Sequence, residues 1–166
     1  VRIQSSTSIK SYSYIEGTHI GKHCQIGPFA RLRPGTNLLE EVKVGNFVEV
    51  KNTTLGSKAK ANHLTYIGDA KVGAHTNIGA GTIFCNYDGK NKNLSVIGDN
   101  VFIGSNASLI APLKIGDASI VAAGSVINRD VPSESLAIAR PIQQNKLGLG
   151  KKIMLNLRKV ADKIRK

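Results

Sequence analysis

The chain has 166 residues, of which 41% are hydrophobic, with only two cysteines and a formal net charge of +12. Two cysteines are too few for a disulfide framework, and the sequence has neither an apolar run of membrane-spanning length nor a secretory signal at its start. These features exclude a disulfide-built secreted scaffold and a membrane-spanning protein, and we expect one cytoplasmic domain with a sizeable core.

The positive charge is concentrated in the last part of the chain. Residues 140–166 hold nine of the 23 Lys and Arg residues and one of the 11 acidic residues, so they carry +8 and residues 1–139 carry +4. The first 139 residues also lack aromatic side chains interleaved with basic ones, the pattern that stacks nucleic-acid bases. We therefore expect no nucleic-acid partner.

Along residues 1–139 an apolar residue returns about every six positions. The recurring residues are Ile3, Ile9, Ile15, Ile20, Ile26, Leu32, Leu38, Val44, Val50, Leu55, Ala61, Ile67, Val72, Ile78, Phe84, Ile97, Ile103, Leu109, Ile115, Val121 and Ile127. In the later repeats a small or apolar residue stands two positions before each of them, a spacing that indicates strand. Each hexad predicts one short strand and a corner, and corners favour glycine and asparagine. Stacked hexads predict an all-β fold, a parallel β-helix.

The six-residue count fails between Phe84 and Val96. The intervening sequence is polar and contains Asn86, Tyr87, Gly89 and Lys92. This interruption predicts a loop over residues 85–95 that projects from the coil, and inserted loops of solenoids often carry function.

The repeat fades after Val131, and a different pattern follows in the tail, residues 140–166. Its apolar residues recur at helical spacing and basic residues lie between them, which predicts an amphipathic basic helix. The apolar positions are Ile153, Leu157, Val160, Ala161 and Ile164. We expect this helix to dock on the coil or on a partner subunit, with a membrane surface or an acidic partner as the alternative.

His63 is the first candidate for chemistry. It lies where the hexad count is least regular, whereas His19, His23 and His75 fall at or beside corners, where a solvated imidazole is expected. An imidazole is the usual general base near neutral pH.

Five segments, taken together, are similar to one family. They are residues 28–35 (PFARLRPG), 44–51 (VGNFVEVK), 63–70 (HLTYIGDA), 77–82 (NIGAGT) and 85–89 (CNYDG). In unbroken order from about Ile20 to Arg140, the sequence resembles the acetyltransferase domain of the bifunctional N-acetylglucosamine-1-phosphate uridylyltransferase/glucosamine-1-phosphate N-acetyltransferases. The resemblance implies a left-handed hexapeptide-repeat coil of triangular cross-section over residues 1–139, and a homotrimer with active sites at the subunit interfaces. The uridylyltransferase half of that family has no counterpart in this sequence.

The same resemblance implies a reaction and its residues. The acetyl group of acetyl-CoA passes to the amine of glucosamine 1-phosphate, giving N-acetylglucosamine 1-phosphate for UDP-N-acetylglucosamine and the cell envelope, without a metal. His63 is then the general base. The sugar phosphate is held by Arg33, Lys51, Tyr66, Asn77 and Lys92, and acetyl-CoA by Ala80, Asn86, Tyr87, Ser105, Ala123 and Arg140. Guanidinium and ammonium groups are the usual partners of a phosphate.

Three alternatives stay open at this point. The chain could be another hexapeptide acyltransferase with a different acceptor, although Arg33 and Lys51 argue for a phosphorylated one. It could resemble the carbonic anhydrases among hexapeptide solenoids, in which three histidines bind zinc across a subunit interface, because His63 and His75 are two hexads apart and could point from comparable faces. It could also be a non-catalytic solenoid, which would leave the loop and the irregular segment around His63 unexplained.

Overall fold

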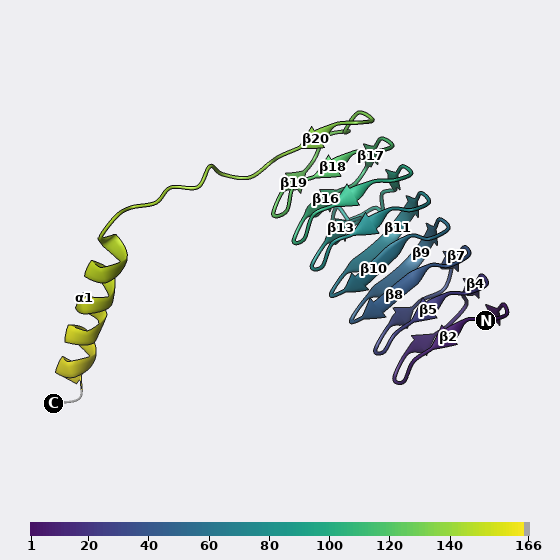
Figure 1. Ribbon diagram of the computed structural model, residues 1–166, viewed down its shortest axis with the longest axis horizontal. Coiled ribbons are helices and arrows are strands. Elements are labelled where there is room, and N and C mark those ends of the chain that lie inside the picture. The colour runs from purple at the N-terminus through teal and green to yellow at the C-terminus, as the bar shows by residue number, and fades with distance from the viewer. Residues whose placement is uncertain (165–166) are drawn as a thin grey trace.

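The computed structural model describes residues 1–164 as a coil of short strands followed by one helix (Figure 1). The strands of the first half are β1 (Arg2–Ile3), β2 (Ser8–Ile9), β3 (Tyr14–Ile15), β4 (His19–Ile20), β5 (Gln25–Ile26), β6 (Arg31–Leu32), β7 (Asn37–Leu38), β8 (Lys43–Asn46), β9 (Glu49–Leu55) and β10 (Lys60–His63). Those of the second half are β11 (Tyr66–Val72), β12 (Asn77–Ile78), β13 (Ile83–Cys85), β14 (Ser95–Ile97), β15 (Phe102–Ile103), β16 (Ser108–Ile110), β17 (Leu113–Ile115), β18 (Ile120–Val121), β19 (Val126–Ile127) and β20 (Leu136–Ala137), and the helix is α1 (Leu149–Ile164).

Each strand pairs in parallel with strands of the neighbouring coils. The partners are 17 or 18 residues apart in most coils, as in the pairs Ile3 with Ile20 and Ile20 with Leu38, and 16 apart in the last coil, as between Val121 and Ala137. Where the projecting loop is inserted the separation becomes 25 residues, as between Val72 and Ile97. The loop therefore adds residues without disturbing the register of the inward-facing positions.

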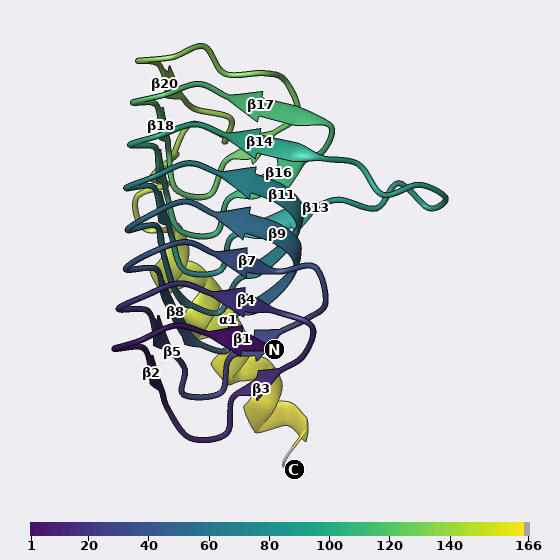
Figure 2. The same ribbon diagram turned by 90° about the vertical axis from the view of Figure 1, so that its right-hand side faces the viewer.

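The coil has three faces. Strands β2-β5-β8-β10-β12-β15-β18-β20 form one face, and the other sheet folds over two faces because the seven-residue strands β9 and β11 continue around an edge. In Figure 2 the near strands β4, β7, β9 and β11 run from right to left while the coil rises from its N-terminal to its C-terminal end, so the coil is left-handed. This hand is the opposite of the usual crossover between parallel strands. The expected left-handed triangular coil is confirmed.

The core is the row of residues that the hexad count marks as inward. From Ile20 to Ile127 every recurring apolar residue is buried, and none is more than 5% exposed. In the first coil Ile3 and Ile9 are 48% and 41% exposed, because among the described residues a coil packs on only one side of them. The periodicity therefore predicts the interior of the prism correctly.

The corners differ from the expectation that glycine and asparagine dominate them. Among residues 1–164, fifteen residues other than glycine have a positive φ, and they include the bulky Tyr12, Phe29, Phe47 and Leu64. Gly104, which follows an inward residue, does not have a positive φ, and a Cβ there would lie 2.4 Å from the backbone nitrogen of Ala123. Glycine after an inward residue thus serves the close approach of the next coil rather than a turn.

Two segments leave the coil. Residues 86–94, between β13 and β14, project from it as a narrow loop (Figure 2). The helix α1 stands apart from the coil at the end of an extended segment, and none of the residues Leu149–Ile164 is buried (Figure 1). The expected helix is present, and it does not dock on its own coil, so docking on a partner subunit stays a prediction. Within residues 1–164 no helix is long and apolar enough to cross a membrane.

The inward row predicts a sharp contrast between neighbours in one strand. In β16 the side chain of Leu109 is fully buried, whereas that of Ile110 is 40% exposed. We expect Leu109→Ala to lower the free energy of unfolding by about 2–5 kcal/mol, because it leaves a cavity in a core that stacked coils cannot close. Ile110→Ala, the control, should lower it by about 1 kcal/mol or less. Denaturant unfolding of both variants measures this, and equal losses would contradict the assigned interior.

Candidate active site

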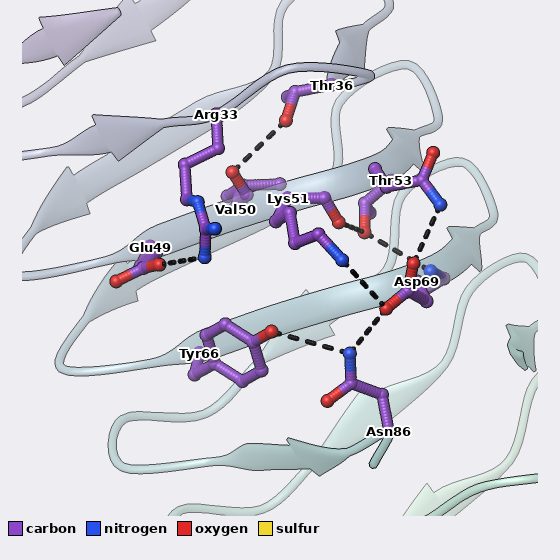
Figure 3. Close-up of polar contacts among 11 residues, drawn as sticks. Arg33, Thr36, Glu49, Val50, Lys51, Thr53, Tyr66, Asp69 and Asn86 are labelled. Atoms are coloured by element: carbon purple, nitrogen blue, oxygen red, sulfur yellow. Dashed lines mark hydrogen bonds and ion pairs between the residues drawn. The ribbon is translucent and has the colours of Figure 1, made fainter. Parts of the chain in front are cut away.

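Three cationic side chains converge on the face formed by β6, β9 and β11. Arg33 follows β6, Lys51 lies in β9 one coil further along, and Lys92 comes from the projecting loop. Arg33 and Lys51 point to the same side of the coil (Figure 3). We call Arg33, Lys51 and Lys92 the cation cluster. Like charges gather in this way where an anion is to be bound.

The charges within the cation cluster perturb one another. The amine of Lys92 beside Lys51, together with the Asp69 carboxylate, raises the pKa of Lys51 against the effect of burial. Lys51 in turn lowers the pKa of the exposed Lys92, and Arg33 adds to this effect. An anion between these groups would relieve the repulsion, so the cluster favours a negatively charged ligand.

Carboxylates hold two members of the cation cluster in place. Glu49 accepts a hydrogen bond from Arg33 (Nη1 to Oε1, 2.9 Å) and lies 3.6 Å from Arg31. Asp69 lies 3.4 Å from Lys51 (Oδ2 to Nζ), and both side chains of this pair are largely buried (18% and 11% exposed for Lys51 and Asp69). The partly buried pair fixes Lys51 more firmly than the surface pair fixes Arg33.

Asp69 also receives two amide hydrogen bonds (Figure 3). Asn52 donates to Oδ1 at 2.7 Å, and Asn86 donates to Oδ2 at 2.5 Å. Burial alone would raise the pKa of Asp69, but the hydrogen bonds from Asn52 and Asn86 and the charge of Lys51 outweigh it, so the pKa lies below its usual value. Asp69 is therefore an anion that anchors Lys51 and Asn86 together.

The side chains of Tyr66 and Asn86 meet over Gly68. The Nδ2 of Asn86 is 3.4 Å from the Tyr66 hydroxyl, to which it donates. A Cβ on Gly68 would lie 2.4 Å from that hydroxyl and 2.7 Å from the Asn86 amide. Gly68 thus leaves the space in which the phenol and the amide meet, beside Lys51.

The projecting loop is ordered around Asp88. Hydrogen bonds from the backbone of Asn91 and Lys90 and from the side chain of Asn93 lower the pKa of Asp88 to about 2. Tyr87 closes the loop from the other side: its hydroxyl donates to the carbonyl of Gly89 at 2.6 Å, and its backbone pairs with Lys92. This local network presents Lys92 at a defined place in an otherwise exposed segment.

His63 lies at an edge of the same coil rather than in the cation cluster. It ends β10 and is exposed, and its Nδ1 is 2.9 Å from Oδ1 of Asn46 on the preceding coil. If Nδ1 carries the proton it donates to Asn46, which leaves Nε2 as the free acceptor. Tyr66 follows three residues later on the next face.

Four further residues occupy the same edge as His63. Each of Asn46, His63, Ala80, Ser105 and Ala123 immediately precedes a corner residue of positive φ on successive coils. We call these five residues the edge row. The carbonyls of Asn46, Ala80 and Ser105 each accept a hydrogen bond from the corner of the coil above. Coils repeat about every 4.8 Å, so Ala123 lies about 14 Å from His63 along the edge.

Arg140 caps the far end of the edge row. Its Nη1 donates to the carbonyl of Ala123 at 2.7 Å. From His63 onward the row therefore leads from an imidazole to the guanidinium of Arg140, with only the short side chains of Ala80, Ser105 and Ala123 between them. Such a strip can take an extended chain along its backbone amides and carbonyls.

Asn77 is the one expected substrate residue that lies elsewhere. It pairs with Lys60 on the face of β10 and β12, where it lines an open groove with His23 and His75. Outward side chains on two different faces of one prism cannot reach one small ligand. A single chain thus brings together Arg33, Lys51, Tyr66, Asn86 and Lys92, but not Asn77.

Sequence reasoning missed the groups that position the others. Four residues hold a candidate residue or its partner in place, and the sequence patterns mark none of them as functional. They are Asp69, Asn52, Glu49 and Asn46. Asp69 stands within the segment 63–70, and Asn46 and Glu49 stand within 44–51, which is the only signal the sequence offers for them. Asn52 lies outside all of these segments.

The zinc alternative loses its geometric basis in the structure. His63 precedes the corner residue Leu64, whereas His75 is itself a corner residue on a different edge of the prism. Among residues 1–164 no three His, Cys, Asp or Glu side chains come together as a metal site would require.

The lowered pKa of Asp69 gives a pH-dependent stability. Ionised Asp69 stabilises the fold above its unfolded pKa of about 4, and this contribution is lost as the pH falls through the lower folded pKa. We expect Asp69→Asn to lower the free energy of unfolding at pH 7 by about 1–3 kcal/mol. The gap to the wild type should shrink below about pH 4. Denaturant unfolding against pH tests this, with Asp162→Asn in α1 as the control, and a pH-independent gap would contradict it.

Comparisons with known proteins agree with the fold and the repeat. The family model described as bacterial transferase hexapeptide (six repeats) matches residues 95–129. Among solved structures, a perosamine N-acetyltransferase mutant from Caulobacter crescentus superposes with a TM-score of 0.58 at 19% identity, covering 87% of this chain and 57% of that one. The acetyltransferase domain of PglB from Neisseria gonorrhoeae gives 0.51 at 17% identity, covering 84% of this chain and 57% of that one. At such identities the likeness concerns the fold alone.

Proteins found by sequence similarity are much more similar to this chain than these structures are. The chain is 62% identical over 143 residues to bifunctional protein GlmU of Nitratidesulfovibrio vulgaris, covering 86% of this chain and 31% of that protein. It is 60% identical over 145 residues to GlmU of Acinetobacter baylyi (87% and 32%) and 54% identical over 157 residues to that of Bartonella quintana (95% and 35%). The chain spans about a third of the length of these curated relatives. With its repeat, its fold and this identity, the chain belongs to the hexapeptide-repeat transferases and is homologous to the C-terminal part of the bifunctional GlmU proteins.

Proposed function

We propose that this chain transfers the acetyl group of acetyl-CoA to the amine of glucosamine 1-phosphate, giving N-acetylglucosamine 1-phosphate. The observation that carries the proposal is the placement of the cation cluster and the edge row on adjoining parts of the same coils. The cation cluster supplies a site for an anionic sugar. The edge row supplies a strip for a long acyl donor, with the base His63 near its start.

The sugar phosphate fits the cation cluster. Arg33 offers a guanidinium fork and Lys51 a fixed ammonium, while Lys92 approaches from the loop. Their mutual repulsion is offset by a doubly charged phosphate, so binding energy is concentrated on that group. Tyr66 and Asn86, beside Lys51, then hydrogen-bond the sugar ring and its amine side.

His63 acts as the general base in this proposal. The amine must be neutral when it attacks, since an ammonium nitrogen has no lone pair. As the nitrogen–carbon bond forms at the thioester carbonyl, Nε2 of His63 takes a proton from that nitrogen. The carbon–sulfur bond then breaks and the proton passes to the departing sulfur, which leaves the N-acetyl sugar and the free CoA thiol. Asn46 holds the imidazole from Nδ1 during these steps.

The acetyl-CoA arm runs along the edge row in this scheme. Ala80, Ser105 and Ala123 present short side chains, so an extended pantetheine chain can approach the backbone of successive coils. With the thioester beside His63, the opposite end of the donor meets Arg140, whose charge suits a CoA phosphate. Asn86 and Tyr87 border the acyl end from the base of the projecting loop.

A homotrimer completes the site in the proposal. Asn77 lies on a different face from the cation cluster, and packing one prism against the next brings two such faces together. The active sites then lie between subunits, and Asn77 contacts the sugar bound to a neighbouring chain. We assign residues 1–139 as this catalytic unit and 140–166 as a separate tail, and we place the reaction in the cytoplasm, where acetyl-CoA is formed and used.

Substitution of His63 tests the base. We expect His63→Ala to lower kcat by about a hundred- to ten-thousandfold, the usual contribution of a positioned general base. The KM for each substrate should change little, because Ala removes no group that binds them. A thiol-release assay with acetyl-CoA and glucosamine 1-phosphate measures this, and His19→Ala, which removes an exposed imidazole in β4, should keep full activity. Unchanged activity in His63→Ala would remove His63 as the base.

Substitution of Lys51 tests the phosphate site. We expect Lys51→Ala to raise the KM for glucosamine 1-phosphate about ten- to a hundredfold, as a lost charged hydrogen bond would. The KM for acetyl-CoA should stay the same, and activity with unphosphorylated glucosamine should not fall. The control, Lys71→Ala, removes an exposed lysine further along β11. If the KM rises equally for both acceptors, Lys51 does not bind the phosphate and another acceptor becomes the better candidate.

A further inference from the structure

The helix α1 carries an apolar face that nothing in the described chain covers. Leu149, Ile153, Leu157, Val160 and Ile164 recur at intervals of three and four residues, which places them on one side of the helix. Their exposed fractions run from 40% to 79%, and Met154, at 55%, extends the same face. This is a continuous apolar strip on an element that the catalytic proposal does not use.

The opposite side of α1 is strongly cationic. Five basic residues lie on it: Lys151, Lys152, Arg158, Lys159 and Lys163. Asp162 is the one acidic residue of α1. By helical spacing Arg158 borders one margin of the apolar face and Lys163 the other. Long basic side chains at such margins can keep their charges in a polar layer while their stems lie along an apolar one.

The net charges of the coil and of α1 favour one kind of surface as the partner of the apolar face. Residues 1–139 carry +4, so a second copy of the coil would bring positive charge toward a positive helix. An anionic surface has the complementary charge. The helix is 16 residues long, about 24 Å at 1.5 Å per residue, which is shorter than a membrane-spanning helix, and its five basic residues rule out a span.

We propose that α1 lies flat on a bilayer of anionic lipid, with Ile153, Leu157 and Val160 inserted below the headgroups and the basic residues among the phosphates. The ligand is the lipid surface itself, recognised by apolar area and negative charge rather than by one headgroup.

The segment before α1 suits this arrangement. Ala139 and Arg140 still bond to the coil, and residues 141–148 then leave it as an extended strip (Figure 1), in which Ile142 and Leu147 are 92% and 99% exposed. Eight extended residues reach up to about 26 Å. The coil can therefore stand away from the bilayer with its cation cluster and edge row open to substrates, and the lipid contact is independent of the proposed reaction.

Vesicle flotation of the full chain tests the proposal. With vesicles of phosphatidylcholine and phosphatidylglycerol we expect most of the protein to float, and with phosphatidylcholine alone at least tenfold less. Raising the salt from 0.1 M to 1 M should release bound protein, because salt screens charges at a surface. Equal flotation on both vesicles, or none on either, would overturn the proposal.

Two leucines of α1 provide a matched pair of variants. Leu157 lies on the apolar face, whereas Leu155 stands four residues after Lys151 and four before Lys159, on the basic side. Leu157→Asp should reduce flotation on the anionic vesicles at least tenfold more than Leu155→Asp, although both add the same charge. Acetyl transfer without vesicles should be the same in both. Equal flotation of the two variants would overturn the proposal, as would a Leu157→Asp variant that floats normally but has a smaller oligomer by light scattering, since the face would then bind another copy.

Discussion

Each coil of this chain satisfies its backbone hydrogen bonds on the coils directly before and after it, and the rest of the structure depends on that stacking. The constraint fixes a pitch of about 4.8 Å and leaves an axis filled almost entirely by small and aliphatic side chains, with Phe84 as the one buried aromatic among residues 1–164. It also excludes a Cβ at positions such as Gly104, where the next backbone passes at close range. Buried threonines reinforce the stack, as Thr36 does by donating to the carbonyl of Val50 at 3.1 Å. All chemistry is thereby displaced to the outer faces and edges.

On those outer surfaces, function arises from departures from the repeat. The loop of residues 86–94 adds Lys92 to a face that already holds Arg33 and Lys51. Asp69, at a corner with a φ of 50°, accepts hydrogen bonds from Asn52 and Asn86 while it pairs with Lys51. The strained corner and the buried anion are stabilised together by these amides. A regular solenoid would have neither.

The sequence predicts the interior well because a single periodicity determines it. Ile103 and Leu109 are inward for the same reason that every sixth apolar residue is, and the break at Phe84 shows where the loop begins. The periodicity does not predict which face of the prism each site residue occupies. Nothing in the apolar pattern indicates that Tyr66 and Asn77 lie on different faces. Bulky corner residues such as Phe29 and Phe47, whose rings stack 5.4 Å apart, also contradict their local preference because neighbouring coils support them.

The edge row has one more property, which concerns length. Because coils repeat at a fixed rise, the distance between His63 and Arg140 is set by the number of coils between them and cannot vary continuously. In the proposed function, the length of a donor bound along this edge is therefore matched in steps of about 4.8 Å. Gain or loss of a whole coil between these two residues would change the donor length that fits by one such step, while leaving the core and both end groups intact. In a coil of this architecture the number of repeats can therefore set the length of ligand that fits, without any change to the residues at either end.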